Sequence, residues 1–417
     1  MASALFSIPQ NLQRRVRLIA FSSASQLIFP ASGLLVSLAV FRFCVPGLWG
    51  QFVNVLLILN FAPHIMGWGN KDYLLRAFSL KPASEVWAWR ESLISRSLFV
   101  LPLLVFLLFY PVSFWLGSLI FIWCVARFVY QSYDVEVLYH KRFLYTFLLE
   151  AGSLLLLLAC IYLTRQTIDI QQLTLDFTIA EILKMGIMVG LFKNKLKNDS
   201  AASELNDAAF TLKTAFKYFA AAFPFFIIGF SGLLQSRTDL ICINYFMPPD
   251  KIGQFQVLTT FLLYIQAGSA YILTPFVKNI YRLAYHRVKS LAIKLFFLGI
   301  AIVVAGTLAT YFVLIYAYHF DPGFMTMLLG ALSILPVFFY LPLIYELYRY
   351  KMSDYVLFIN LVGIVLGFVL NIVFITHFDN GIHGALAATA TVQWLYIPVY
   401  LYFRSHQPKQ TPTDVAS

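Results

Sequence analysis

Long apolar runs alternate with short polar connections along nearly the whole chain. Most of these runs reach the roughly 20 residues that an α-helix needs to cross the hydrocarbon core of a bilayer. Because that core offers no water to backbone amides, such segments are expected to be helical throughout. The pattern therefore predicts an all-α, polytopic membrane protein with about 12 transmembrane helices. The predicted spans lie near residues 18–41, 48–66, 97–114, 116–133, 143–163, 173–192, 215–246, 253–277, 291–316, 324–347, 355–375 and 385–403.

Two short motifs of the first half of the chain recur, in the same order, in the second half. Ser32-Gly33-Leu34-Leu35 returns as Ser231-Gly232-Leu233-Leu234, and Gly50-Gln51-Phe52 returns as Gly253-Gln254-Phe255. Both offsets are close to half the chain length, which favours a duplicated unit. A unit with an even number of spans keeps its orientation, so the two copies would be related by an axis along the membrane normal. We accordingly predict a six-helix lobe at 1–192, a cytoplasmic linker at 193–213, a second six-helix lobe at 214–404 and a disordered tail at 405–417.

Composition and charge agree with a membrane protein. Of the 417 residues, 60% are hydrophobic and only 12% are charged, against about 25% charged in soluble domains. The net charge of +11 does not indicate nucleic acid, because the basic residues fall in the connections between apolar runs. On the side opposite the amino terminus, the connections hold only Arg165 and Lys251. This bias places both termini in the cytoplasm, with the basic connections against anionic lipid headgroups.

Prolines interrupt several of the predicted spans. Pro30 and Pro224 are each expected to break the first span of a half. Broken helices at matching places in two halves are typical of a transport pathway. Kinks that serve only helix packing are the alternative for any one of these prolines.

Three regions resemble a known family. Arg237-x-Asp239 at the end of the seventh span leads, after a short outer turn, to Gly253-Gln254-Phe255, and the first span leads to Gly47-Leu48-Trp49-Gly50-Gln51-Phe52. Near the end, Asn360 and Asn371 precede Gly381-Ile382-His383-Gly384-Ala385-Leu386-Ala387-Ala388-Thr389. These motifs resemble the oligosaccharide (O-antigen) flippases of the multidrug/oligosaccharidyl-lipid/polysaccharide exporter superfamily. Many members of that family have fourteen spans, whereas twelve are predicted here.

The resemblance covers nearly the whole chain and carries implications for fold and function. It implies two six-helix lobes around a central cavity, alternating access, and a bacterial cytoplasmic (inner) membrane location. The implied cargo is a prenyl-pyrophosphate-linked oligosaccharide, and the polysaccharide polymerase machinery would be a neighbouring partner.

Six ionisable residues within or at the edge of spans are the candidate site. An ionised side chain at the centre of a span costs about 2.5–3.5 kcal/mol on insertion scales, so it normally faces protein or a wet cavity. Under the resemblance, basic residues would contact the phosphates of the cargo, and acidic residues would bind a coupling proton or sodium ion or hold a basic partner. The basic candidates are Arg237, Arg42 and Arg127, and the acidic candidates are Asp239, Glu150 and Glu181.

Each candidate also has a structural interpretation. Arg237 and Asp239 point about 200° apart on one helix, so each would need an ion partner on another helix. Arg127 and Glu150 on consecutive spans favour a salt bridge, and Glu181 shares a helix face with Lys184. Arg42 at the outer end of its span is also placed to reach lipid headgroups.

Absent motifs narrow the function further. The chain contains no Gly-x-x-x-x-Gly-Lys-Ser/Thr loop, no His-Glu-x-x-His and no Gly-x-Ser-x-Gly, and its four cysteines lack metal-ligand spacing. We therefore expect no cofactor, no metal and no enzymatic activity. A cation-coupled small-molecule (multidrug-type) exporter is the alternative function, followed by a membrane-embedded polysaccharide polymerase. The polymerase is disfavoured because no outer connection is long enough to carry acid–base groups.

Overall fold

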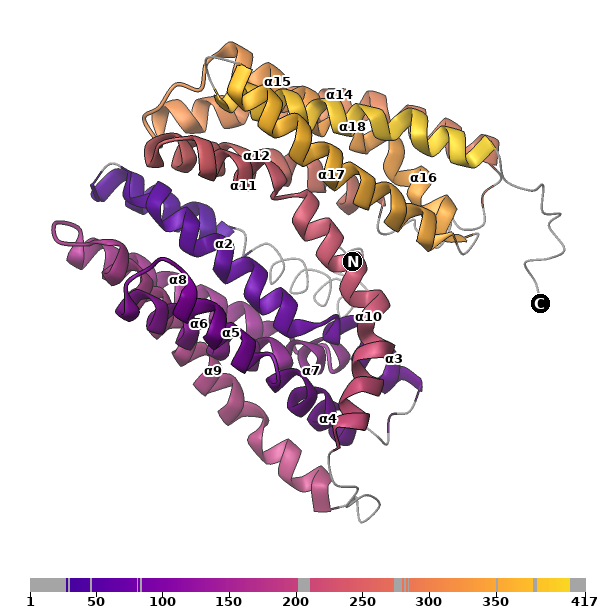
Figure 1. The fold of residues 1–417 in the computed structure, drawn as a ribbon. Helices are drawn as coiled ribbons and strands as arrows, with labels where there is room; N and C mark the ends of the chain where they lie inside the picture. The colour runs from indigo at the N-terminus through magenta and orange to yellow at the C-terminus, as the bar shows by residue number, and fades with distance from the viewer. Residues whose placement is uncertain are drawn as a thin grey trace, which may run out of the picture. The chain divides into compact units, whose positions relative to one another are not determined.

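The structure is a computed structural model that describes residues 28, 31–45, 47–80, 82, 85–201, 211–273, 280, 283, 285–349, 352–377 and 381–405. Over these residues the chain is helical and contains no strand, which confirms the all-α prediction (Figure 1). It forms two compact units, Met1–Phe230 and Ser231–Ser417. The predicted tail at 405–417 lies, apart from its first residue, outside the described residues.

The first unit is a bundle built around α6. This helix packs against α2, α5 and α9, and α8 packs on α9. Phe52, Ile120 and Cys124 lie at the centre of this bundle and are fully buried. Its helices are Ala31–Phe43, α2 (Leu48–Gly67), α3 (Asn70–Leu80), α4 (Glu85–Ser97), α5 (Val100–Phe109), α6 (Phe114–Ser132), α7 (Asp134–Tyr139), α8 (Phe143–Thr164), α9 (Ile170–Ala201) and the first part of α10 (Leu212–Gln235).

The second unit is a bundle in which α18 packs against α17 and α15, while α14 packs against α16. Gly384 allows the close approach of α18 to α17, because a Cβ at this position would collide with the backbone of Phe374. The glycines of the predicted entry to the last span thus have a packing reason. Besides the end of α10, the helices are α11 (Thr238–Phe246), α12 (Pro249–Leu273), α14 (Tyr285–Tyr316), α15 (Phe324–Ile334), α16 (Val337–Arg349), α17 (Ser353–His377) and α18 (Gly381–Ser405).

Each predicted span coincides with helix in the described part of the chain. Nine helical stretches there are long and apolar enough to cross a membrane. The short helix Ala31–Phe43, the charged α9 and the less apolar α18 account for the other predicted spans. Two of the spans are broken in mid-course, between α10 and α11 and between α15 and α16.

The helices are apolar on the outside, as expected where lipid is the solvent. On α8 the buried residues recur at helical spacing and include an acid, whereas leucines on the other face are exposed. A polar group buried among helices and an apolar rim is the arrangement that a bilayer favours. The buried set is Glu150, Ser153, Leu154, Leu157 and Ile161, and the exposed leucines include Leu148, Leu155 and Leu163.

The recurring Gly-Gln-Phe motif occupies equivalent positions in the two units. In the first unit Gly50 and Phe52 lie at the start of α2, and in the second Gly253 and Phe255 lie at the start of α12. All four residues are buried, and both phenylalanines are 0% exposed. The motif is thus buried in the same way in both units, and the duplication itself stays a prediction.

The amino-terminal part of α10 belongs to the first unit because it packs on the elbow between α2 and α3. Trp68 stacks on Phe226 with ring centroids 4.1 Å apart, and its indole N–H donates to the carbonyl of Phe219 at 3.1 Å. A Cβ at Gly69 would lie 2.5 Å from the backbone nitrogen of Phe226. The contacts therefore divide the chain at Phe230, beyond the connection at 193–213 where the sequence placed the linker. Helix α9 also continues through the first part of that connection, to Ala201.

Candidate functional site

The seventh predicted span is broken at Ser236 and Arg237, between α10 and α11. Three side-chain and backbone donors satisfy the carbonyls that the break releases. Ser236 Oγ donates to the carbonyl of Leu233 at 2.9 Å, Thr238 Oγ1 to that of Leu234 at 2.8 Å, and the Arg237 N–H to that of Leu234 at 3.2 Å. Hydroxyl groups compete in this way with the regular helical ladder.

The expectation that Pro224 breaks this span is wrong. Helix α10 runs from Leu212 to Gln235 with Pro224 inside it. A proline removes one hydrogen bond from the ladder, and in a membrane helix the freed carbonyl can be satisfied without ending the helix. The position of Pro30, the expected counterpart, lies outside the described residues.

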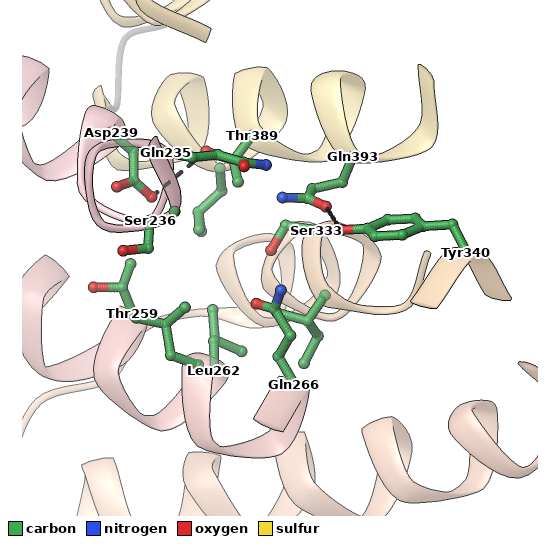
Figure 2. A pocket seen from close by; sticks show the side chains of 14 residues that line it. Gln235, Ser236, Asp239, Thr259, Leu262, Gln266, Ser333, Tyr340, Thr389 and Gln393 are labelled. Carbon is green, nitrogen blue, oxygen red and sulfur yellow. Dashed lines mark hydrogen bonds between the residues drawn. The ribbon is translucent and has the colours of Figure 1, made fainter. Parts of the chain in front are cut away.

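A polar pocket of about 180 Å³ adjoins the break, within the second unit. Figure 2 shows side chains from α10, α11, α12, α15, α16 and α18 converging on it. Nine of its fourteen lining residues are polar, although the helices of this part of the chain are mainly apolar. The polar lining residues are Gln235, Ser236, Asp239, Thr259, Gln266, Ser333, Tyr340, Thr389 and Gln393.

Asp239 is the acidic residue of the polar pocket. It lies in the first turn of α11, where the helix dipole favours a negative charge. Its Oδ1 accepts from the N–H of Leu240 at 2.7 Å, and its Oδ2 accepts from Thr389 Oγ1 at 3.5 Å (Figure 2). In the described part of the chain neither Asp239 nor Arg237 forms an ion pair.

The amide and phenol groups of this region were not anticipated from the sequence. The Tyr340 hydroxyl donates to Gln393 Oε1 at 2.6 Å (Figure 2). Gln235 Nε2 donates to the Tyr396 hydroxyl at 2.9 Å. Single glutamines within apolar runs were the only signal in the sequence for these polar groups. The fold is needed to show that Gln235 on α10, Gln266 on α12 and Gln393 on α18 face one pocket.

A ring of four ion-paired residues, the ion-pair ring, lies in the first unit between α6, α8 and α9. Arg127 Nη1 lies 3.5 Å from Glu150 Oε1 and 3.2 Å from Glu181 Oε1. Lys184 Nζ lies 3.1 Å from Glu150 Oε2 and 2.7 Å from Glu181 Oε2. All four residues are buried, and both cations also lie within 5.3 Å of the Tyr130 ring centroid.

The ion-pair ring confirms the predicted Arg127–Glu150 and Glu181–Lys184 pairs and adds two cross-pairs. Two cations and two anions alternate, so the ring carries no net charge. Buried charges with this mutual compensation join three helices, and removing one partner leaves the others uncompensated. Arg42, by contrast, lies exposed in the last turn of the helix Ala31–Phe43.

Among the other buried ionisable residues, Asp176 and Arg96 were not anticipated from the sequence. Asp176 on α9 is 4% exposed; its Oδ1 accepts from Gln172 at 2.9 Å, and its Oδ2 has no hydrogen-bond partner among the described residues. Arg96 is 1% exposed and donates to Ser92 and to Ser132 Oγ, rather than lying in a solvated basic connection. An acid in an otherwise apolar run was a signal for Asp176, whereas Arg96 resembled an ordinary topogenic charge.

The comparisons with known proteins concern the fold. No family model matches the chain, and no curated protein matches its sequence. The lipid II flippase MurJ, in an inward closed conformation, matches with a TM-score of 0.67 at 15% identity, over 94% of this chain and 88% of that chain. A multidrug resistance MATE family transporter of the MOP superfamily, in an inward-facing conformation, matches with a TM-score of 0.59 at 11% identity, over 89% and 93%.

These likenesses show that the chain has the fold that these two transporters share. The exporter superfamily and its O-antigen branch, both indicated by the motifs, remain predictions.

Proposed function

We propose that the protein is a flippase that moves a prenyl-pyrophosphate-linked oligosaccharide across the bacterial cytoplasmic membrane by alternating access. The fold likeness to a lipid II flippase over nearly the whole chain supports this class of function. The energetic problem is to move a polar glycan and two phosphates past hydrocarbon, since polar groups without partners are costly there. Polar and ionised side chains inside spans are the means to lower that cost.

The observation that carries the proposal is the position of Arg237. It stands at the break between α10 and α11, next to the polar pocket, and forms no ion pair with any described residue. A guanidinium inside a span calls for an anionic partner, and arginine binds phosphate in a planar, bidentate geometry. We assign Arg237 to the cargo phosphate, with Arg42 as a second contact at the outer end of its helix.

Asp239 is the proposed site of the coupling ion. Its carboxylate lies in the polar pocket with the hydroxyl groups of Ser236, Thr259 and Thr389. Oxygen ligands of this kind suit a sodium ion, and the carboxylate alone suffices for a proton. We assign Glu150, Glu181 and Arg127 to a structural role, because the ion-pair ring already satisfies their charges.

Substitution of Arg237 tests the flippase function. A strain carrying Arg237→Ala should accumulate the lipid-linked glycan on the inner leaflet and lose surface polysaccharide, while Arg237→Lys should retain part of the activity. Lys251→Ala removes one positive charge at an exposed position in the first turn of α12 and serves as the control. Normal surface polysaccharide in the Arg237→Ala strain, at normal protein level, would contradict the proposal.

A multidrug-type exporter is the second candidate, favoured by the likeness to the MATE transporter. Overexpression should then raise the resistance of a sensitive strain to cationic drugs, and Asp239→Asn should abolish that resistance. If overexpression leaves drug resistance unchanged but alters the surface polysaccharide, the result favours the flippase over the multidrug-type exporter.

A further inference from the structure

Three side chains able to ligate a metal meet at one place in the first unit. Glu85 lies in the first turn of α4, Glu136 lies on α7, and His140 directly follows α7. One ligand atom from each residue lies within 4.8 Å of the other two. We propose that these three side chains bind a divalent transition-metal ion. The proposal uses no residue of the polar pocket or the ion-pair ring and does not depend on the transport function.

The end of α7 positions two of the three ligands. Glu136 and His140 are four residues apart, so their side chains project from one face, a turn apart. The helix ends here because Lys141 adopts the left-handed conformation, with φ 55°. The N–H of Arg142 then donates to the carbonyl of Val137 at 2.8 Å, which closes the helix end. The backbone from which the imidazole projects is therefore fixed by local hydrogen bonding.

The distances between the ligand atoms suit a small divalent ion. His140 Nε2 lies 2.8 Å from Glu85 Oε1 and 3.5 Å from Glu136 Oε2. Zn²⁺ holds nitrogen and carboxylate ligands at about 2.0–2.2 Å, which places the ligand atoms of a tetrahedral site roughly 3.3–3.6 Å apart. The longer separation falls within that range and the shorter one is about 0.5 Å below it, so small side-chain rotations would complete three positions and leave a fourth for water.

The charges of the cluster also suit a dication. The same imidazole nitrogen faces both carboxylates, and one N–H proton at that nitrogen cannot point well at two acceptors. A metal ion would accept all three ligands and cancel both negative charges. The Glu136 side chain is only 2% exposed, and buried carboxylates are normally paired or coordinate metals. The His140 side chain is 29% exposed, which leaves an approach for the ion.

The ligand types select among metals. One imidazole with two carboxylates is a borderline set that suits Zn²⁺, whereas Mg²⁺ and Ca²⁺ prefer oxygen ligands throughout. The bound ion would connect the start of α4 to the end of α7, two elements that also meet through the buried aromatic cluster around Trp89 and Tyr133. Its effect would be to stabilise this end of the unit.

Zinc binding by the purified protein tests the proposal. Full-length protein in detergent, free of any polyhistidine tag, is stripped of metal, titrated with Zn²⁺ and desalted, and its zinc content is measured by mass spectrometry. We expect one zinc ion per chain and a higher melting temperature with zinc than without it. His140→Ala and Glu85→Gln should each weaken zinc affinity at least about tenfold, and Mg²⁺ should not displace the zinc.

The control variant is His286→Ala, which removes an exposed histidine from α14 and should bind zinc as the parent does. Glu136 is buried, so the two more exposed ligands provide the decisive variants. Equal zinc content in the parent, His140→Ala and Glu85→Gln would mean adventitious binding and would overturn the proposal. A parent that retains no zinc would overturn it too.

Discussion

Asp176 and Glu181 are neighbouring acids on α9 with opposite surroundings. Glu181 lies 3.2 Å from Arg127 and 2.7 Å from Lys184. Asp176 is also buried, but its side chain accepts from the neutral amide of Gln172, and it forms no ion pair with a described residue. The cost of losing the negative charge should therefore differ sharply between the two residues, although both are acids in the same span.

Amide substitutions at the two acids test this difference. Glu181→Gln should lower the free energy of unfolding by about 3–5 kcal/mol, because Arg127 and Lys184 would be left as two buried cations sharing Glu150. Asp176→Asn keeps the shape and a carbonyl for Gln172, so it should change stability by less than about 1 kcal/mol. Thermal unfolding of the purified variants in detergent measures both. Equal losses of stability in the two variants would contradict the stabilising role assigned to the ion-pair ring.

The sequence predicted part of the candidate site at the residue scale. Arg127 with Glu150, and Glu181 with Lys184, were predicted as pairs because consecutive spans and helical spacing bring them together. The cross-pairs were not predictable, because they depend on how α6, α8 and α9 rotate about their axes. The same limit hid the Glu85–Glu136–His140 cluster, because two predicted spans separate Glu85 from Glu136 and His140 in the sequence.

At the scale of the elements, apolar runs predicted the positions of the helices well, but not the positions at which a helix is interrupted. The spans follow from length and hydrophobicity alone, which is why each coincides with helix over its described residues. The break at Ser236 and Arg237 depends on hydroxyl groups that replace backbone donors, and a proline was the wrong signal for it. Polar groups that satisfy a carbonyl locally leave no periodic pattern to recognise in the sequence.

Close helix packing offers a test with an internal control. Gly384→Ala should destabilise the protein by about 1–3 kcal/mol, because the added methyl group meets the backbone of Phe374, which cannot rotate away. Gly186→Ala on α9 adds the same group where nothing lies within 4 Å. That variant should be neutral or slightly stabilising, since alanine is the better helix former. Melting temperatures of the two variants give the comparison, and a loss at Gly186 as large as at Gly384 would contradict the packing argument.

At the scale of the whole molecule, the repeated motif and the membrane topology are linked. The Gly-Gln-Phe motif begins a helix in both units, with the phenylalanine fully buried each time. A duplicated unit with an even number of spans keeps its orientation, so both copies of the motif should start their helices from the same side of the membrane. The charge bias predicts that this is the outer side, because Lys251 lies just before the second copy in one of the poorly basic connections.

Cysteine labelling measures the side of each connection directly. In a variant lacking the four native cysteines, Lys251→Cys and Arg165→Cys should react with a membrane-impermeant thiol reagent on intact cells, since both side chains are exposed and predicted to lie outside. Lys141→Cys is equally exposed but belongs to a basic connection, and it should react only after the cells are permeabilised. Because Lys141 adjoins His140, the same result would place the proposed zinc site on the cytoplasmic side, where intracellular zinc could reach it. Labelling of Lys141→Cys in intact cells would contradict the predicted topology. It would also contradict the proposed transport from the inner to the outer leaflet, which assumes that topology.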